Sequence, residues 1–490
     1  MFLKIGYKTP FFGLSILLIV FLASSCKSSV GSYEEDKPNI ILFYADDLGW
    51  TDLSLQGSDF YETPAIDRIA KEGIRFTHAY ANASNCAPSR ACLVTGLYTP
   101  RHGIYTVNNS DRGNAGNRKL VPVKNTTVLD RKFQTLPESL RENGYATCIA
   151  GKWHLSSDPV PYGFDENFGG YERGHPNSYF SPYNNPALTD GTPGEHLPGR
   201  LSTEVSNWIK KNADTPFFVY LPFYSVHTPI QARQDLVDKY VGKTPGQVHD
   251  HVKYAAMIEA MDQAVAKILG AVEELGLSEN TMVIFTSDNG PNGGVSLAKP
   301  LRGTKGMYYE GGIRVPFYVK WPKTILPGRI SSEPITGMDI FPTLLDVIKS
   351  AERPGLDGES LLPLLKGAKR LGERELYWHF PAYLQTGKNN RAYHEAHTPG
   401  WRATPCSVIR DGDWKLIEYF ESGEQELFNL KNDPGERKDL SDIEIKKREE
   451  LYAKLSRWRE DTNAPVPTEI NPGYTGNATP GFKVEHTDNL

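Results

Sequence analysis

Cysteine is scarce in this sequence, which has five cysteines among 490 residues. Their positions (26, 86, 92, 148 and 406) match neither a disulfide framework nor a zinc site. Positive charge is not in excess, and a net charge of −5 excludes the usual basic nucleic-acid binder. Internal repeats and long low-complexity tracts are also lacking. We therefore expect no structural metal cluster and no nucleic-acid partner, whereas a small anionic substrate needs only local positive charge.

The apolar stretch near the N-terminus is too short to span a membrane comfortably. Lys4 and Lys8 precede it, it runs over 11–23, and small residues lead to Cys26, as in an export signal. Cys26 resembles the lipidated cysteine of bacterial lipoproteins. Ala23 stands where that pattern usually has leucine, so plain cleavage is the alternative. The prediction is a signal peptide over 1–25, a tether over 26–37, and an exported protein of the periplasm or outer-membrane surface, anchored at Cys26.

Four short apolar runs dominate the middle of the chain, at 39–44, 145–150, 217–221 and 281–286. Continuous runs of this length are typical of strands buried on both faces of a parallel sheet. Helical patterns separate them, for example from Thr63-Pro64 to Gly73 and from Tyr254 to Gly276. The alternation predicts an α/β catalytic domain over 38–365, with a large, mixed but mostly parallel sheet and helices on both faces.

The pattern changes after about residue 366. Runs at 376–380, 407–410 and 414–418 predict short strands, with a hairpin signal at Asp411-Gly412, and a charged helix is predicted over 443–459. We therefore expect a smaller α+β domain with an antiparallel sheet over 366–465. An extended tail is expected over 466–490.

Unusual polar residues follow each of the four central strands. Asp46-Asp47 and Asp288-Asn289 come after the first and last of them. An acidic residue at a strand end is commonly a turn residue or a helix cap. Two such pairs at the ligand-binding edge of an α/β sheet instead favour a site for Ca²⁺, with Mg²⁺ as the second choice, because all the ligands are oxygen atoms.

The run Cys86-Ala87-Pro88-Ser89-Arg90 is the most informative motif. Pro88 suits the first turn of a helix, and a cysteine at the positive end of a helix beside a guanidinium favours a reactive anionic group. A buried structural cysteine is the alternative. The motif resembles the signature of the type I, formylglycine-dependent sulfatases, and the resemblance covers roughly 38–441. It extends to the closing run 426–434, which is similar to the family's C-terminal domain.

The resemblance implies an alkaline-phosphatase-like fold and a sulfuric ester hydrolase. It also implies that a maturation enzyme converts Cys86 to 3-oxoalanine (formylglycine), whose hydrate attacks sulfur in line. By the same resemblance Arg90 steadies that hydrate, His154 is the base that restores the aldehyde, and His227 is the acid for the leaving group. Two further groups of residues follow from it: sulfate ligands Lys152 and Lys305, and metal ligands Asp46, Asp47, Cys86, Asp288 and Asn289.

The leaving alcohol is expected to belong to a sulfated carbohydrate, with galactose or N-acetylgalactosamine sulfates of host or algal glycans favoured by analogy. The segment 388–404 is a surface loop or a sugar-binding rim. Its candidate specificity residues are His394, His397, Trp401 and Arg402. Two other functions stay open: a phosphoesterase or phosphonate hydrolase of the same superfamily, and a catalytically inactive glycan-binding surface lipoprotein.

Overall fold

The central sheet of this computed structural model contains the four predicted strands side by side. The structure describes residues 1–10, 37–351, 354–386 and 390–476, so Cys26 and most of the predicted signal segment lie outside the described residues. Within the described chain, eight strands form this sheet in the following order: β5 (Glu166–Phe168), β4 (Ala146–Ala150), β6 (Phe217–Pro222), β1 (Asn39–Ala45), β7 (Thr281–Ser287), β8 (Phe317–Lys320), β2 (Ile74–Phe76) and β9 (Arg329–Ser331).

The first five strands run parallel to one another, and β8 pairs antiparallel with both β7 and β2. The prediction of a mixed, mostly parallel sheet is thus confirmed. Alternate residues of β1 enter different cores: Ile41 and Phe43 belong to one hydrophobic cluster, whereas Ile40 and Leu42 belong to another. Because both faces of the strand are covered, its sequence is a continuous apolar run and not an alternating one.

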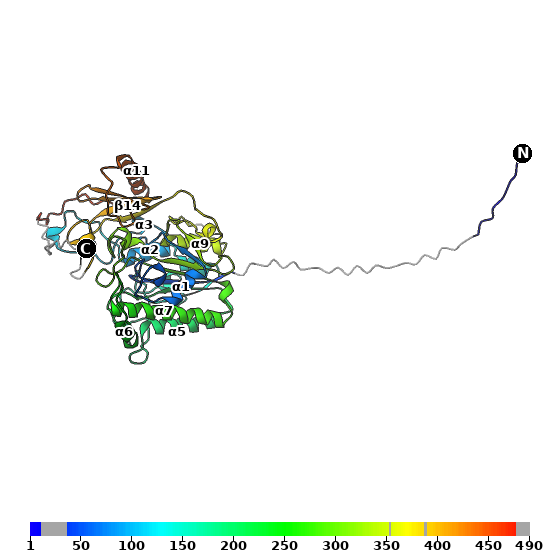
Figure 1. Cartoon of the computed structure of the whole chain (residues 1–490), viewed down its shortest axis with the longest axis horizontal. Coiled ribbons are helices and arrows are strands. Elements are labelled where there is room, and N and C mark those ends of the chain that lie inside the picture. Colours follow the sequence, from blue (N-terminus) through cyan, green and yellow to red (C-terminus); the bar gives the residue numbers. More distant parts are fainter. Residues whose placement is uncertain (11–36, 352–353, 387–389, 477–490) are drawn as a thin grey trace. The chain divides into compact units, whose positions relative to one another are not determined.

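Helices cover both faces of the sheet, as Figure 1 shows. One layer contains α1 (Pro64–Lys71), α5 (Leu197–Lys211), α6 (Gln234–Val241) and α7 (Val252–Glu274). The other contains α2 (Cys86–Thr95), α4 (Leu136–Glu142), α9 (Ile340–Val347) and α10 (Leu362–Leu365). Short helices α3 (Thr99–His102) and α8 (Glu310–Ile313) lie in the loops.

A second, antiparallel sheet is built from the C-terminal part of the described chain. Its order is β11 (Glu375–Phe380), β14 (Cys406–Asp411), β15 (Trp414–Tyr419) and β16 (Gln425–Asn429), and α11 (Ile445–Thr462) packs on it. Two small ribbons pair β3 (Ala79–Tyr80) with β10 (Ile335–Thr336) and β12 (Leu384–Gln385) with β13 (Trp401–Ala403). The α+β prediction for this region is confirmed.

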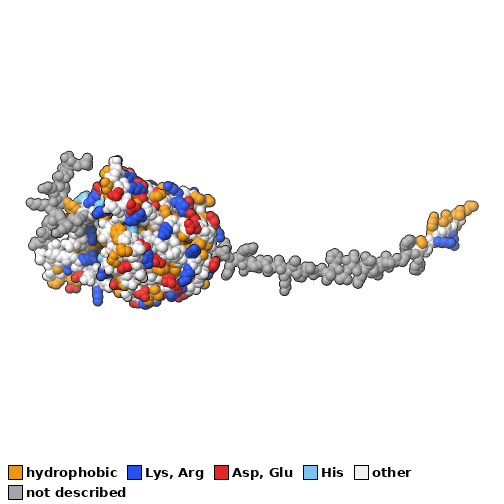
Figure 2. All heavy atoms as spheres, turned by 90° about the horizontal axis from the view of Figure 1, so that it is seen from below, with side chains coloured by type: hydrophobic (Ala, Val, Ile, Leu, Met, Phe, Trp, Pro, Cys, Tyr) orange, Lys and Arg blue, Asp and Glu red, His pale blue; other side chains and the backbone are white. Residues whose placement is uncertain are grey.

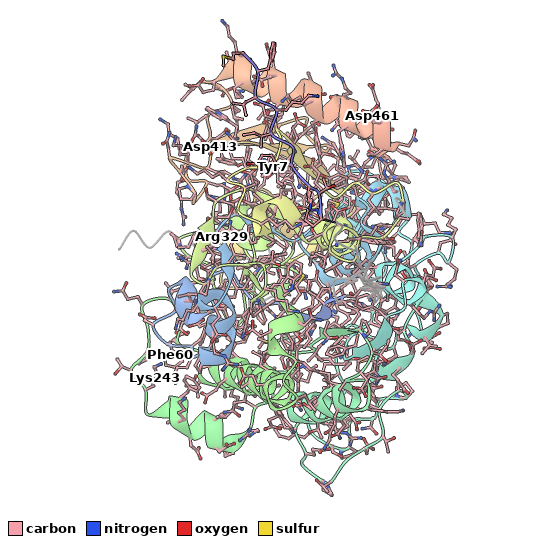
Figure 3. The ribbon with its side chains drawn as sticks, turned by 90° about the vertical axis from the view of Figure 1, so that its right-hand side faces the viewer. Tyr7, Phe60, Lys243, Arg329, Asp413 and Asp461 are labelled. Carbon is pink, nitrogen blue, oxygen red and sulfur yellow. The ribbon has the colours of Figure 1, made fainter. Side chains whose placement is uncertain are left out.

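The described residues from Lys37 onward form one compact unit, and within it the predicted boundary at 365/366 coincides with a change of sheet. Part of the predicted tail packs on that unit, because Asn471 donates to the carbonyls of Ala115 and Arg118. In Figure 3, Asp413 and Asp461 of the C-terminal region lie toward one end, and Phe60 and Lys243 toward the other.

Basic and acidic side chains are interspersed on the face in Figure 2, in keeping with the small net charge. No helix among the described residues combines the length and the apolar character needed to cross a membrane.

Candidate active site

The two acidic pairs meet at the carboxyl edge of the central sheet. Ala45 at the end of β1 is in register with Ser287 at the end of β7, so Asp46-Asp47 and Asp288-Asn289 leave the sheet at the same level. All four side chains are fully buried. The Asp47 backbone N–H donates to Asp288 Oδ1 (3.1 Å), and Asn289 Nδ2 donates to Asp47 Oδ1 (2.8 Å). The strand ends therefore build one cluster.

This cluster fits a divalent cation with oxygen ligands. Asp46 Oδ1 and Asn289 Oδ1 are buried and have no hydrogen-bond partner among the described residues. Asp46, Cys86 and Asp288 each place one donor atom within 4.8 Å of the others. Orphaned buried oxygen atoms are costly, and a hard cation such as Ca²⁺ or Mg²⁺ would satisfy them. The set contains no histidine, which is unlike a typical zinc site.

Each carboxylate of the cluster is paired with at least one basic side chain. Lys152 Nζ lies 2.7 Å from Asp46 Oδ2, and Lys305 Nζ lies 2.6 Å from Asp47 Oδ1. Arg90 donates twice to Asp288 Oδ2 and once to the Lys152 carbonyl. Burial alone would lower the pKa of Lys305, but Asp47 raises it above the ordinary value. Both partners of the pair are therefore charged.

Cys86 is the first residue of α2, as the proline-containing motif predicts, with Asn85 in extended conformation before it. Cys86 is 3% exposed and borders a hollow near the strand ends. Arg90, one turn further along α2, is fully buried and faces Asp288. The helix thus aims its positive end and Cys86 at the same cavity.

His154 follows β4 and adopts φ = 66°, a left-handed conformation that is uncommon for residues other than glycine. Asp47 shares it, with φ = 62°. The His154 Nδ1 atom is buried without a hydrogen-bond partner in the described chain, and burial holds the pKa of this imidazole well below its ordinary value. His154 is therefore neutral and able to accept a proton.

His227 lies on the same cavity wall. Its Nδ1 is 2.8 Å from the Thr228 carbonyl, so Nδ1 carries the hydrogen, and Nε2 lies 3.7 Å from Asp47 Oδ2. Burial, followed by the positive charge of Lys305, lowers the pKa of His227 to about 3, although Asp47 acts in the opposite direction. The ring is neutral in the ligand-free protein, with its Nε2 lone pair available.

One cavity of about 560 Å³ gathers most of the predicted chemistry. Cys86, His154, His227 and Lys305 all line it. Arg90 and Lys152 do not line it, because both are fully buried below the wall against Asp288 and Asp46. To contact a bound sulfate directly, the fully buried Lys152 ammonium would have to become accessible from the cavity.

Of the four candidate specificity residues, Arg402 alone lines this cavity. Trp401 is buried against Tyr383, with ring centroids 5.0 Å apart, and His397 stacks on Tyr419 at 3.6 Å. His394 is exposed. Lys388 and Asn389, at the start of the predicted rim, lie outside the described residues. A sugar-binding role of this segment stays a prediction.

Several cavity residues carried no recognisable sequence signal. They lie in irregular loops with neither periodicity nor a motif: Asn108, Arg112, Glu172, Arg173, His175 and Asn292. Their convergence on one cavity depends on tertiary contacts.

Known proteins resemble this chain over most of its length. Residues 38–350 match the family model described as Sulfatase, and residues 304–462 match that of the C-terminal region of N-sulphoglucosamine sulphohydrolase. A sulfatase of Formosa agariphila is 34% identical over 94% of this chain and 94% of its own. N-acetylgalactosamine-6-sulfatase of Homo sapiens is 31% identical, covering 88% and 87% of the two chains. The structure of Ps i-CgsB in complex with k-i-k-neocarrahexaose is similar with a TM-score of 0.72 and 28% identity, over 89% of this chain and 95% of that one.

Proposed function

We propose, from the premise that this chain belongs to the sulfatase family and is a sulfuric ester hydrolase, that its substrates are sulfated carbohydrates. The observation that carries the proposal is the convergence of Cys86, His154, His227 and Lys305 on one cavity above an oxygen-rich cluster. A nucleophile, two proton carriers and a fixed cation are the parts that sulfate-ester cleavage requires.

Two groups complete the proposed site. We infer that Cys86 is oxidised by a formylglycine-generating maturation enzyme, and that the hydrated aldehyde supplies the oxygen that attacks sulfur in line. We also infer that Asp46, Asp47, Asp288 and Asn289, together with the modified Cys86, hold Ca²⁺, which withdraws charge from the sulfate. The orphaned Asp46 and Asn289 oxygen atoms support the second inference.

Of the three cationic residues, only Lys305 lines the cavity and can act on the sulfate group directly. Lys305 lies on the cavity wall and stays charged, so it stabilises negative charge on the sulfate oxygens. Arg90 is held by two hydrogen bonds to Asp288, which fixes positive charge at the start of α2, next to residue 86. Lys152 is bonded to Asp46 and sets the charge balance below the cavity.

The histidines move protons. A bound sulfate ester brings negative charge next to His227, which favours its protonated form, and the ring can then protonate the sugar oxygen as the S–O bond breaks. Neutral His154, with no partner on Nδ1 in the described chain, can accept a proton from the nucleophilic group at residue 86. Water enters the overall reaction, and the products are the sugar alcohol and sulfate.

The carbohydrate class is supported by two similar proteins: one is named after a sulfated sugar, N-acetylgalactosamine-6-sulfatase, and the other was solved in complex with k-i-k-neocarrahexaose. Galactose and N-acetylgalactosamine sulfates of host or algal glycans are the favoured members of that class. A phosphoesterase with two transition metals is disfavoured, because the oxygen cluster lacks histidine. An inactive glycan-binding lipoprotein is disfavoured, because a binder would not need Cys86 and two buried histidines in one cavity.

The mass of the peptide that contains Cys86 tests the proposal, together with sulfate release from a panel of sulfated sugars. We expect the mass change for replacement of CH₂SH by CHO, and loss of sulfate release in Cys86→Ala. Cys92→Ala is the matched control: it lies on the same helix, its sulfur faces His102, and it does not line the cavity. An unmodified Cys86 in active protein would contradict the formylglycine mechanism.

We further propose export to the periplasm or outer-membrane surface, with lipid attachment at Cys26. The basic, apolar and small-residue segments before Cys26 support this proposal. Mass spectrometry of the mature N-terminus should find a lipid-modified cysteine, and Cys26→Ser should move the protein from the membrane fraction to the soluble periplasmic fraction. A mature N-terminus at another residue would contradict anchoring at Cys26.

A further inference from the structure

Three arginines on the cavity wall, Arg112, Arg173 and Arg402, have no acidic partner among the described residues, and Arg112 and Arg402 also line a second hollow. Arg112 donates to the Val107 carbonyl (2.6 Å), and Arg402 Nε donates to the Gln385 carbonyl (3.2 Å). Among the described residues, neither guanidinium lies within ion-pair distance of a carboxylate. The other basic residues of the site differ in this respect, because each is paired with an aspartate of the oxygen-rich cluster: Arg90, Lys152 and Lys305. The arginine pair therefore carries positive charge that the protein does not neutralise.

The pair lies where two hollows adjoin. Both arginines line the 560 Å³ cavity that contains Cys86, and both also line an outer hollow of about 520 Å³. The outer hollow is otherwise lined by Asn108, Gly113, Leu384, Gln385 and Thr386. A ligand whose sulfate reaches Cys86 and whose remainder extends outward would pass the two guanidinium groups.

Close packing holds the pair in place. Gly306, the residue after Lys305, has φ = +91°. A Cβ atom at this position would come within 3.1 Å of Arg402 Cδ, so the aliphatic part of Arg402 packs against the backbone of Gly306. Gly113, where φ is +81°, would place a Cβ atom 2.8 Å from the Trp401 ring. Gly113 is next to Arg112 and Trp401 is next to Arg402. The packing of Gly113 on Trp401 thus holds the loop that carries Arg112 against the β12–β13 ribbon. This is a built feature and not two freely moving surface side chains.

The two positive charges also disfavour each other in the free protein. Burial, and then the charge of Arg112, lowers the pKa of Arg402 to about 10. Burial likewise lowers the pKa of Arg112. Both groups remain protonated at neutral pH. An anion placed between them would relieve this electrostatic cost and could accept charge-assisted, bidentate hydrogen bonds.

We propose that Arg112 and Arg402 form a second anion subsite, which binds a sulfate or carboxylate group on the sugar next to the one that loses its sulfate. The substrate is then an oligosaccharide with at least two negative groups. This inference rests on the proposed function and narrows its substrate class. One acidic side chain, that of Glu172, lines the cavity. It is exposed and lies in the loop that also carries Arg173 and His175.

Four disaccharides test the subsite. All carry the sulfate to be removed, and the neighbouring sugar carries a second sulfate, a carboxylate, the methyl ester of that carboxylate, or no substituent. We expect kcat/KM to be roughly ten- to a hundredfold higher for at least one of the two anionic neighbours than for the ester and the unsubstituted sugar, as for a charge-assisted hydrogen bond. The sulfate and carboxylate substrates distinguish the two sources of the anion.

Arginine variants locate the preference. Arg402→Gln and Arg112→Gln should each reduce the ratio of kcat/KM between the preferred anionic substrate and its neutral counterpart by about tenfold. Arg402→Lys should retain part of it, because a point charge remains without the bidentate geometry. Arg391→Gln is the control, since Arg391 lies in the same segment but points to Asp250. Its ratio should equal that of the wild type.

Binding without turnover gives a second readout. In a Cys86→Ala background, calorimetry with the anionic disaccharide should show about tenfold weaker binding when Arg402→Gln is added, and no such loss with the methyl ester. Equal kcat/KM for all four substrates, or an unchanged ratio in both glutamine variants, would overturn the second anion subsite. If wild-type protein releases sulfate from none of the four, the proposed function itself is at fault.

Discussion

Gly174 lies against the imidazole of His154. A Cβ atom at position 174 would come within 2.5 Å of His154 Cε1 and 2.7 Å of Nε2. His154 itself has φ = 66°, and its Nδ1 has no partner in the described part of the chain. The orientation of this ring therefore depends on the absence of a side chain in a loop that is distant in sequence.

The variant Gly174→Ala should displace the His154 ring and reduce kcat. Misplacing a proton carrier by a fraction of an ångström to an ångström costs about tenfold to a hundredfold in rate. The melting temperature should change little, because Gly174 is on the cavity side and has no positive φ. Gly270→Ala in α7, where a Cβ atom meets nothing within 4 Å, is the control. Wild-type turnover in Gly174→Ala would show that the ring position is unimportant.

Removal of the metal should abolish activity. Chelation should stop sulfate release, and Ca²⁺ should restore it better than Mg²⁺ because the ligands are oxygen atoms in a buried, irregular cluster. Elemental analysis of active protein should find one calcium per chain. Stoichiometric zinc without calcium would instead support the phosphoesterase alternative.

Asp288→Asn should lose both metal and stability. Asp288 accepts two hydrogen bonds from buried Arg90, so the variant removes the nearer charged partner of that guanidinium and leaves only Asp46, at 3.8 Å, at a cost of up to about 3–5 kcal/mol. Chemical denaturation and metal content measure the two effects separately. Asp52→Asn is the matched control: Asp52 is also buried but bonds to Tyr254 and Ser296. It should retain the metal.

The acid role of His227 should depend on the leaving group. A sugar alkoxide needs a proton as it departs, whereas an acidic phenol does not. His227→Gln should therefore reduce kcat/KM on a sulfated sugar by a factor of about 10²–10⁴. The corresponding factor for an aryl sulfate should be at least about ten times smaller. Comparing the two substrates within one variant controls for misfolding. Equal losses on both would assign His227 to sulfate binding and not to proton transfer.

Asp262 of α7 should make stability depend on pH. Its carboxylate accepts the Ala65 and Ile66 N–H groups at the start of α1, and burial raises its pKa to about 7. A raised acid pKa means that the folded state binds more protons than the unfolded state between roughly pH 4 and pH 7. The contribution of Asp262 to the free energy of unfolding therefore falls as pH rises through this window.

Two variants separate charge from capping. Asp262→Asn should flatten the decline in stability across that window, because the side chain at position 262 then no longer titrates. Asp262→Ala should lower the free energy of unfolding by about 1–2 kcal/mol through loss of the cap. Denaturant titrations at several pH values measure both. An Asp262→Asn curve parallel to the wild type would contradict the raised pKa.

The chemistry at the strand ends was readable from the sequence because it depends on local patterns. A strand buried on both faces must be a continuous apolar run, and the residues that follow it must lie at the sheet edge; Asp46 and Asp288 follow from this alone. The start of α2 at Cys86 also follows locally, from Pro88 and the polar residues before the motif.

Only the tertiary structure determined what surrounds that chemistry. Arg112 and Arg402 come from an early loop and from the C-terminal ribbon, and no periodicity relates them. Their meeting depends on the packing of Gly113 on Trp401 and of Gly306 on Arg402. Such contacts are set by side-chain volume and loop path across the whole chain, which a local pattern does not encode. The sequence therefore indicated Arg402 as a candidate specificity residue, but it indicated neither Arg112 nor the meeting of the two arginines on one wall.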